Sequence, residues 1–94
     1  MNIRETFKQA GFESASKVTE VYRLCHKGRD SWYRLEIAEE FSTGRYTAKP
    51  YREVEDEDTG HITLETLIDF PWVDQRTAQE ALHDVLDFLA DRLK

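Results

Sequence analysis

The chain has 94 residues and a formal net charge of −6, with 34% of its residues charged. A chain of this length has room for one hydrophobic core, so we expect a single domain that spans residues 1–94. No apolar run approaches the ~20 residues that cross a bilayer, and the lone Cys25 excludes an internal disulfide. The start of the chain also lacks the apolar centre of a secretory signal, and these features together predict a cytoplasmic protein.

The charge is unevenly distributed along the chain. Residues 1–52 contain ten Lys or Arg and seven Asp or Glu, a balance of +3, whereas residues 53–94 have a balance of −9. An acidic half repels phosphate and attracts basic surfaces. This distribution disfavours direct binding of nucleic acid and favours a positively charged partner.

Capping residues and alternation predict one short helix followed by four strands. Asn2 and Glu5 have the spacing of a helix N-cap and its partner, which predicts a helix over residues 3–10. Beta-branched and aromatic residues are frequent in the segments that follow, and turn residues separate these segments. Because the turns are short, we expect an antiparallel meander. The four predicted strands are residues 17–27, 31–41, 45–55 and 61–70.

Two strands carry further signals. Pro50 has no N–H to donate to a neighbouring strand, so an edge position or a bulge is expected there. In the fourth strand, the alternation places one group of apolar residues on a single face. These residues are Ile62, Leu64, Ile68 and Phe70.

The last segment predicts an amphipathic helix that runs to the C-terminus. Thr77 and Glu80 have the spacing of a capping box. Apolar residues then recur at steps of three and four, from Ala78 to Leu93. The fold expected from the whole chain is α+β in two layers: a four-stranded antiparallel meander with the N- and C-terminal helices on one face, in the order α-β-β-β-β-α. Trp72 lies in the link before this helix, where we expect it to cap the core rather than anchor a partner.

Carboxylates are concentrated in two places. Five of them fall between Glu53 and Asp58, ahead of a Thr-Gly turn, but the spacing is not that of a calcium loop, because Thr66 stands where an EF-hand needs a bidentate Glu. In the last helix, Glu80, Asp84, Asp87 and Asp91 form one stripe opposite the apolar face, with no Lys or Arg between residues 77 and 91. If the two segments lie close together, they form one extended negative surface.

A complete catalytic motif is missing. Cys25 and His26 are adjacent on a predicted strand, so their side chains point to opposite faces and do not form a dyad with each other. The three histidines have no metal-ligand spacing, and the glycines occur singly at turns rather than in a phosphate-binding loop. We therefore predict a protein that is not an enzyme and has no cofactor and no metal site.

The leading hypothesis is a small acidic interaction module that binds a basic protein surface. One version is an inhibitor that imitates phosphate charge in a nucleic-acid site, as phage-encoded counter-defence proteins of this size can. The predicted partner-binding residues are Glu53, Glu55, Asp56, Glu57, Asp58, Glu80, Asp84, Asp87 and Asp91.

Two alternatives remain open. A sheet that presents aromatic and basic side chains can bind single-stranded nucleic acid, and the candidate residues for this function are Trp32, Arg34, Tyr46 and Lys49. A homodimer can also form if the positive first half of one chain pairs with the negative second half of another.

Overall fold

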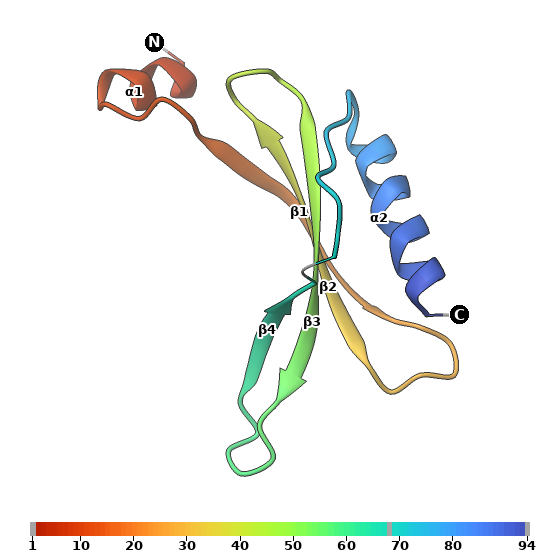
Figure 1. Ribbon diagram of the computed structural model, residues 1–94. Helices are drawn as coiled ribbons and strands as arrows, with labels where there is room; N and C mark the ends of the chain where they lie inside the picture. Colours follow the sequence, from red (N-terminus) through yellow and green to blue (C-terminus); the bar gives the residue numbers. More distant parts are fainter. Residues whose placement is uncertain (1, 68, 94) are drawn as a thin grey trace.

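The structure is a computed structural model that describes residues 2–67 and 69–93. Its element order is α-β-β-β-β-α, as the sequence predicts, and the four strands form one antiparallel sheet in the order β1-β2-β3-β4. Figure 1 shows this sheet as a long twisted ribbon with α2 along one side of it. The elements are α1 (Ile3–Gln9), β1 (Ser16–Cys25), β2 (Trp32–Glu40), β3 (Tyr46–Glu55), β4 (Ile62–Thr66) and α2 (Ala78–Arg92).

The face of the sheet that α2 covers is set by the alternation in β2. Tyr33, Leu35 and Ile37 point toward the helix and are buried, whereas Trp32 is exposed on the other face. Because side chains alternate along a strand, the register between strands extends this division across the sheet. We call the face away from α2 the open face.

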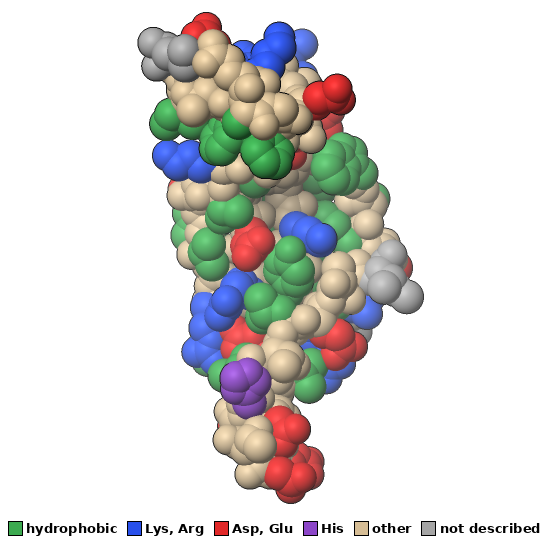
Figure 2. Space-filling model, turned by 90° about the vertical axis from the view of Figure 1, so that its left-hand side faces the viewer, with side chains coloured by type: hydrophobic (Ala, Val, Ile, Leu, Met, Phe, Trp, Pro, Cys, Tyr) green, Lys and Arg blue, Asp and Glu red, His purple; other side chains and the backbone are tan. Residues whose placement is uncertain are grey.

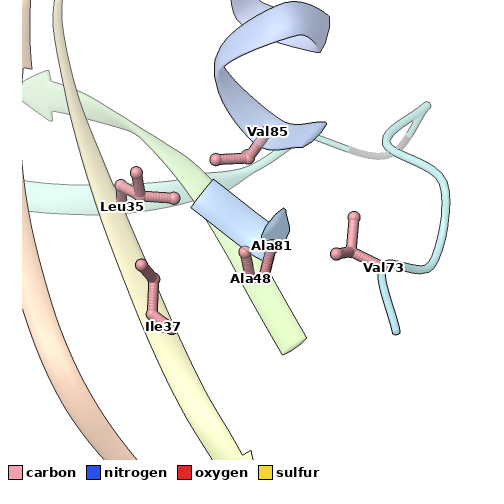
Figure 3. Close-up of a cluster of buried hydrophobic side chains, with 6 residues drawn as sticks. All are labelled: Leu35, Ile37, Ala48, Val73, Ala81 and Val85. Atoms are coloured by element: carbon pink, nitrogen blue, oxygen red, sulfur yellow. The ribbon is translucent and has the colours of Figure 1, made fainter. Parts of the chain in front are cut away.

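The hydrophobic core lies between the covered face and α2. Three residues one helical turn apart, Ala81, Val85 and Leu89, are the buried residues of α2. Figure 3 shows how Val85 and Ala81 approach the strands from the helix, while Val73 approaches from the segment before it. The main cluster contains Leu35, Ile37, Ala48, Val73, Ala81 and Val85.

Helix α2 begins as its capping residues predict. The side chain of Thr77 accepts a hydrogen bond from the backbone N–H of Glu80 at 3.1 Å and donates one to the Glu80 carboxylate at 3.0 Å. The helix is held at its other end by Arg92, which forms an ion pair with Asp69 at 2.6 Å. Neither helix in the described residues is long and apolar enough to cross a membrane.

The segment between β4 and α2 differs from the expectation. Strand β4 stops at Thr66, and Ile62 and Leu64 lie on the open face with 47% and 38% of their surface exposed. Leu67, immediately after the strand, is buried instead. The face predicted for Ile62 and Leu64 together with Phe70 is therefore wrong, because the chain turns after Thr66 and Phe70 packs against the core from outside the strand. Ile68, assigned to the same face, lies outside the described residues.

Pro50 confirms the expectation of a local edge. It lies in β3, which is flanked by β2 and β4, but β4 begins to pair with β3 only at Tyr51. On that side Pro50 therefore faces no strand neighbour in the part of the chain that the structure describes, so its missing N–H costs no ladder hydrogen bond there. Its side chain is fully buried.

Helix α1 lies apart from the core. The helix begins with Asn2 as its N-cap, as predicted, and has no buried residue. Its contact with the rest of the chain includes the ring of Phe7 near that of Phe41, with 6.1 Å between their centres. The sequence predicts both helices on one face. In the structure only α2 packs along the sheet, and α1 stands on the opposite side (Figure 1), because two turns carry too little apolar surface to compete for the covered face.

Candidate functional site

The hairpin between β3 and β4 ends in a cluster of exposed carboxylates. We call Glu55, Asp56, Glu57 and Asp58 the acidic tip; every residue from Glu55 to Thr66 is exposed. Two backbone hydrogen bonds close the hairpin, both at 2.8 Å: the N–H of Asp56 donates to the carbonyl of His61, and the N–H of Gly60 donates to the carbonyl of Asp56. Gly60 adopts a φ of +72°, which glycine accommodates without strain. Figures 1 and 2 show that this hairpin projects beyond the body of the sheet.

Asp56 organises the acidic tip. Its carboxylate oxygen Oδ1 accepts hydrogen bonds from the backbone N–H of Asp58 at 2.8 Å and of Thr59 at 3.0 Å. These bonds, first that from Thr59 and then that from Asp58, hold the pKa of Asp56 below its usual value of 3.8. Asp56 therefore fixes the turn and stays ionised in mildly acidic solution, while the other three side chains point their charges into solvent.

The acidic tip has no internal cation. Within residues 2–67 and 69–93, none of its four carboxylates forms an ion pair with a Lys or Arg. Like charges held this close gain from an external positive charge, because such a charge removes their mutual repulsion.

Glu53 does not belong to the same surface. Its side chain is only 5% exposed, and both of its carboxylate oxygens accept hydrogen bonds from Arg23 at 2.8 to 3.1 Å. Hydrogen bonds from Arg23 lower the pKa of Glu53 from its ordinary value of 4.5. The assignment of Glu53 to partner binding is therefore corrected: this carboxylate already has a cation, which the chain itself supplies.

The predicted stripe on α2 is present but not uniform. Glu80, Asp87 and Asp91 are exposed, whereas Asp84 is half-buried and accepts a hydrogen bond at 2.6 Å from the side-chain amide of Gln75. Asp87 lies 3.2 Å from His83, and both side chains are 71% exposed. Among the described residues, the side chains that hydrogen-bond to Glu80 and Asp84 are the neutral groups of Thr77 and Gln75.

The two acidic segments do not form one surface. In Figure 1, α2 runs beside the upper part of the sheet, while the acidic tip extends past its lower end. The extended negative surface that the sequence allows would need the two to be adjacent. The acidic tip is the more accessible of the two, since it projects from the body of the molecule.

The open face carries most of the residues of the alternative site. Trp32 and Arg34 are on this face in β2. Lys49 is on the same face in β3, where it lies opposite Glu36 of β2. Tyr46 is not with them: it pairs with Glu39 in register and packs against the buried cluster on the covered face. The four residues proposed for nucleic-acid binding are therefore split between the two faces of the sheet.

Acidic and basic side chains alternate on the open face. The guanidinium of Arg23 lies 4.1 Å from the centre of the Trp32 ring, so one face of this ring is already covered. The charge of Arg23 is paired with Glu53, and Lys49 faces the ring of Tyr51 at 5.4 Å. Figure 2 shows hydrophobic, acidic and basic side chains intermingled on this face, with acidic side chains gathered at the end of the hairpin.

Sequence reasoning missed the role of Arg23 and the position of Trp72. Arg23 is 30 residues from Glu53 in the sequence, and β2 lies between the strands β1 and β3 that carry them. The pair therefore becomes visible only once the register of the three strands is known. Trp72 is 78% exposed rather than a cap on the core, which corrects the expectation. Its neighbours Phe70, which packs against both core clusters, and Val73, which is buried, cover the core there instead.

In the described part of the chain, no group of three or more His, Cys, Asp or Glu side chains is arranged to hold a metal ion. Comparison of the chain with protein-family models, with curated proteins and with solved structures gives no match. The candidate surfaces therefore rest on their own geometry and charge.

Proposed function

We propose that this protein is a non-catalytic interaction module that binds a positively charged protein surface, with the acidic tip as its principal contact. The observation that carries the proposal is the projection of Glu55, Asp56, Glu57 and Asp58 from the end of the β3–β4 hairpin, where no Lys or Arg of the described residues pairs with them. A narrow projecting hairpin can enter a groove that the body of the protein cannot, and its charge speeds encounter with a basic partner.

The hydrogen bonds within the acidic tip support this function. Asp56 accepts two backbone N–H groups, so the turn is ordered before a partner arrives. A preformed turn loses less conformational freedom on binding than a flexible loop does. The remaining carboxylates need only exchange water for the donors of the partner.

The carboxylates of α2 provide a second negative surface on another part of the molecule. Glu80 and Asp87 face solvent, so they contribute to the long-range field even where they make no contact. A nucleic-acid site is one class of basic surface that fits two separated rows of negative charge. Inhibition of a nucleic-acid-binding protein by imitation of phosphate charge is therefore a specific form of this proposal.

The test compares two variants with the same net charge. The tip variant carries Glu55→Gln, Glu57→Gln and Asp58→Asn, and leaves Asp56 in place to keep the turn. The control variant carries Glu13→Gln, Asp30→Asn and Glu65→Gln, which are exposed positions outside the acidic tip. Each set removes three negative charges, so the formal net charge of −6 becomes −3 in both.

The measurement is affinity capture from a native lysate at low salt, followed by elution with salt and quantification of each captured protein. We expect the tip variant to lose partners that the wild type and the control variant both retain. Equal loss in both variants would show that net charge alone governs binding, and equal retention would show that the acidic tip makes no contact. Either result overturns the proposal.

A further inference from the structure

The edge of β3 contains a gap that no strand within residues 2–67 and 69–93 fills. Strand β3 has ten residues and β4 has five, so β4 pairs with β3 only from Tyr51 onward. The chain then leaves the sheet at Leu67 and returns to β3 at Gln75, where Gln75 and Tyr46 exchange two backbone hydrogen bonds at 2.8 and 2.9 Å. Residues Thr47 to Pro50 lie between these two attachment points.

Backbone groups of β3 point into this gap. On the side toward β2, the carbonyl of Arg45 accepts a hydrogen bond from the N–H of Glu40. On the other side, the N–H of Tyr46 donates to the carbonyl of Gln75, and the N–H of Asp56 donates to the carbonyl of His61. In antiparallel sheets the direction of N–H and C=O alternates from one residue to the next. The even-numbered residues of β3 therefore face away from β2. At Ala48 this presents one N–H and one C=O to the gap, and at Pro50 a C=O alone.

A cavity of about 350 Å³ occupies the same place. Its walls come from β3, from Leu67 after β4, and from the returning segment, which contributes Phe70, Trp72 and Val73. The lining is mainly apolar, Trp72 is 78% exposed at this site, and Lys49 is the one charged residue among the described residues that line it. A large apolar side chain fits a cavity of this size and composition.

We propose that this gap binds an extended peptide segment of a partner protein by strand addition to β3. One peptide residue would exchange hydrogen bonds with the N–H and C=O of Ala48, as Gln75 does with Tyr46 one pair further along the strand. This site lies on the sheet rather than at the acidic tip, so the inference is independent of the function proposed above.

The alternation of side chains defines the peptide. The residue opposite Ala48 places its side chain on the same side as Ala48, toward Phe70 and Val73, and should therefore be large and apolar. The residues before and after it point to the other side, toward Lys49, and should be acidic. An acidic residue, a large apolar residue and a second acidic residue form the recognised pattern.

The test uses the whole chain labelled with nitrogen-15 and a capped peptide, acetyl-Thr-Asp-Leu-Asp-Thr-amide. Two further peptides carry Phe or Val in place of the central Leu. In the free protein, the amide of Ala48 should exchange with solvent faster than the amides of Thr47 and Lys49, which face β2. Added peptide should shift the Ala48 amide resonance and slow its exchange. A version with N-methylleucine at the centre lacks the donor for the Ala48 carbonyl and should bind about tenfold more weakly.

Variants locate the contact. Trp72→Ala should weaken peptide binding without unfolding the protein, because the side chain is largely exposed. Lys49→Gln should weaken it about two- to fivefold, as expected for an exposed charge pair. Lys27→Gln, which removes an exposed lysine from the β1–β2 turn, is the matched control and should have no effect.

Three results would overturn the inference. Slow exchange of the Ala48 amide in the free protein would show that its N–H already has a partner. Equal affinity for the N-methylated peptide would show that the cavity holds a side chain or small molecule without strand addition. Absence of any shift at Ala48 with all three peptides at millimolar concentration would show that the gap is closed to peptides.

Discussion

The guanidinium of Arg23 on β1 passes over the ring of Trp32 on β2 and binds both carboxylate oxygens of Glu53 on β3. One ion pair therefore connects two strands that are not neighbours, and it does so on the face of the sheet that α2 leaves open. Glu53 is almost fully covered, whereas Arg23 is half exposed. The stabilising effect of the pair depends on the cation staying in place.

Removing Arg23 alone should destabilise the protein more than removing both partners. Arg23→Gln leaves a covered carboxylate without its cation, while the double variant Arg23→Gln with Glu53→Gln leaves no uncompensated charge. Urea denaturation gives the free energy of unfolding of each variant. Arg52→Gln, an exposed arginine on β3, is the control and should change little. A double variant less stable than Arg23→Gln would contradict this account.

The same pair predicts how stability depends on pH. The pKa of Glu53 is lowered in the folded protein, chiefly by hydrogen bonds from Arg23, so folding favours its charged form. The contribution of the Glu53 charge to the free energy of unfolding is therefore complete above its ordinary pKa of 4.5. This contribution is lost as the pH falls through the lower pKa of the folded state. Glu53→Gln should lose less stability than the wild type between pH 6 and acidic pH, as measured by urea denaturation across that range. Parallel pH profiles of the two proteins would refute the prediction.

The start of α2 gives a prediction with a magnitude. Thr77→Ala removes the acceptor of the Glu80 N–H and the donor to the Glu80 carboxylate. Loss of an N-cap of this kind costs about 1 kcal/mol of stability, and thermal or urea denaturation measures it. Thr77→Ser keeps the hydroxyl and should restore most of the loss. If serine and alanine are equally destabilising, the lost methyl group and not the cap is responsible.

Single-stranded nucleic acid should bind weakly or not at all. The charge of Arg23 is neutralised by Glu53, the ring of Trp32 is partly covered, and Glu36 lies opposite Lys49. Fluorescence anisotropy of a labelled oligothymidine in low-salt buffer measures this directly. Binding that appears at low salt and fades as salt rises would favour the open face as a nucleic-acid site, and loss of that signal in Lys49→Gln would locate it.

Local sequence patterns predict the elements of this fold well. The periodicity of apolar residues and the Thr77–Glu80 spacing predict α2, and alternation between turns predicts the strands. Pro50 also predicts a local edge, because the effect of a missing N–H is confined to one residue. Each of these signals depends on residues that are close together in the sequence.

Contacts that depend on the register between strands or on the path of a turn cannot be predicted from such local patterns. The face occupied by Ile62 and Leu64 follows from their register with Glu55 and Glu53. The end of β4 at Thr66 separates Phe70 from that face, and no residue nearby marks that end strongly. The pairing of Glu53 with Arg23 needs the alignment of three strands, so the sequence assigns Glu53 to the exposed carboxylates beside it. The exposure of Trp72 likewise depends on how the returning segment crosses the edge of β3.

The β3–β4 hairpin beyond Glu55 contributes no buried side chain, so its composition is decoupled from the packing that holds the domain together. Mutations there can change the charge and shape of the surface without eroding the fold, and the segment is a natural position for grafting a foreign epitope. A lineage carrying this scaffold would be free to vary the side chains of the hairpin far faster than those of the core.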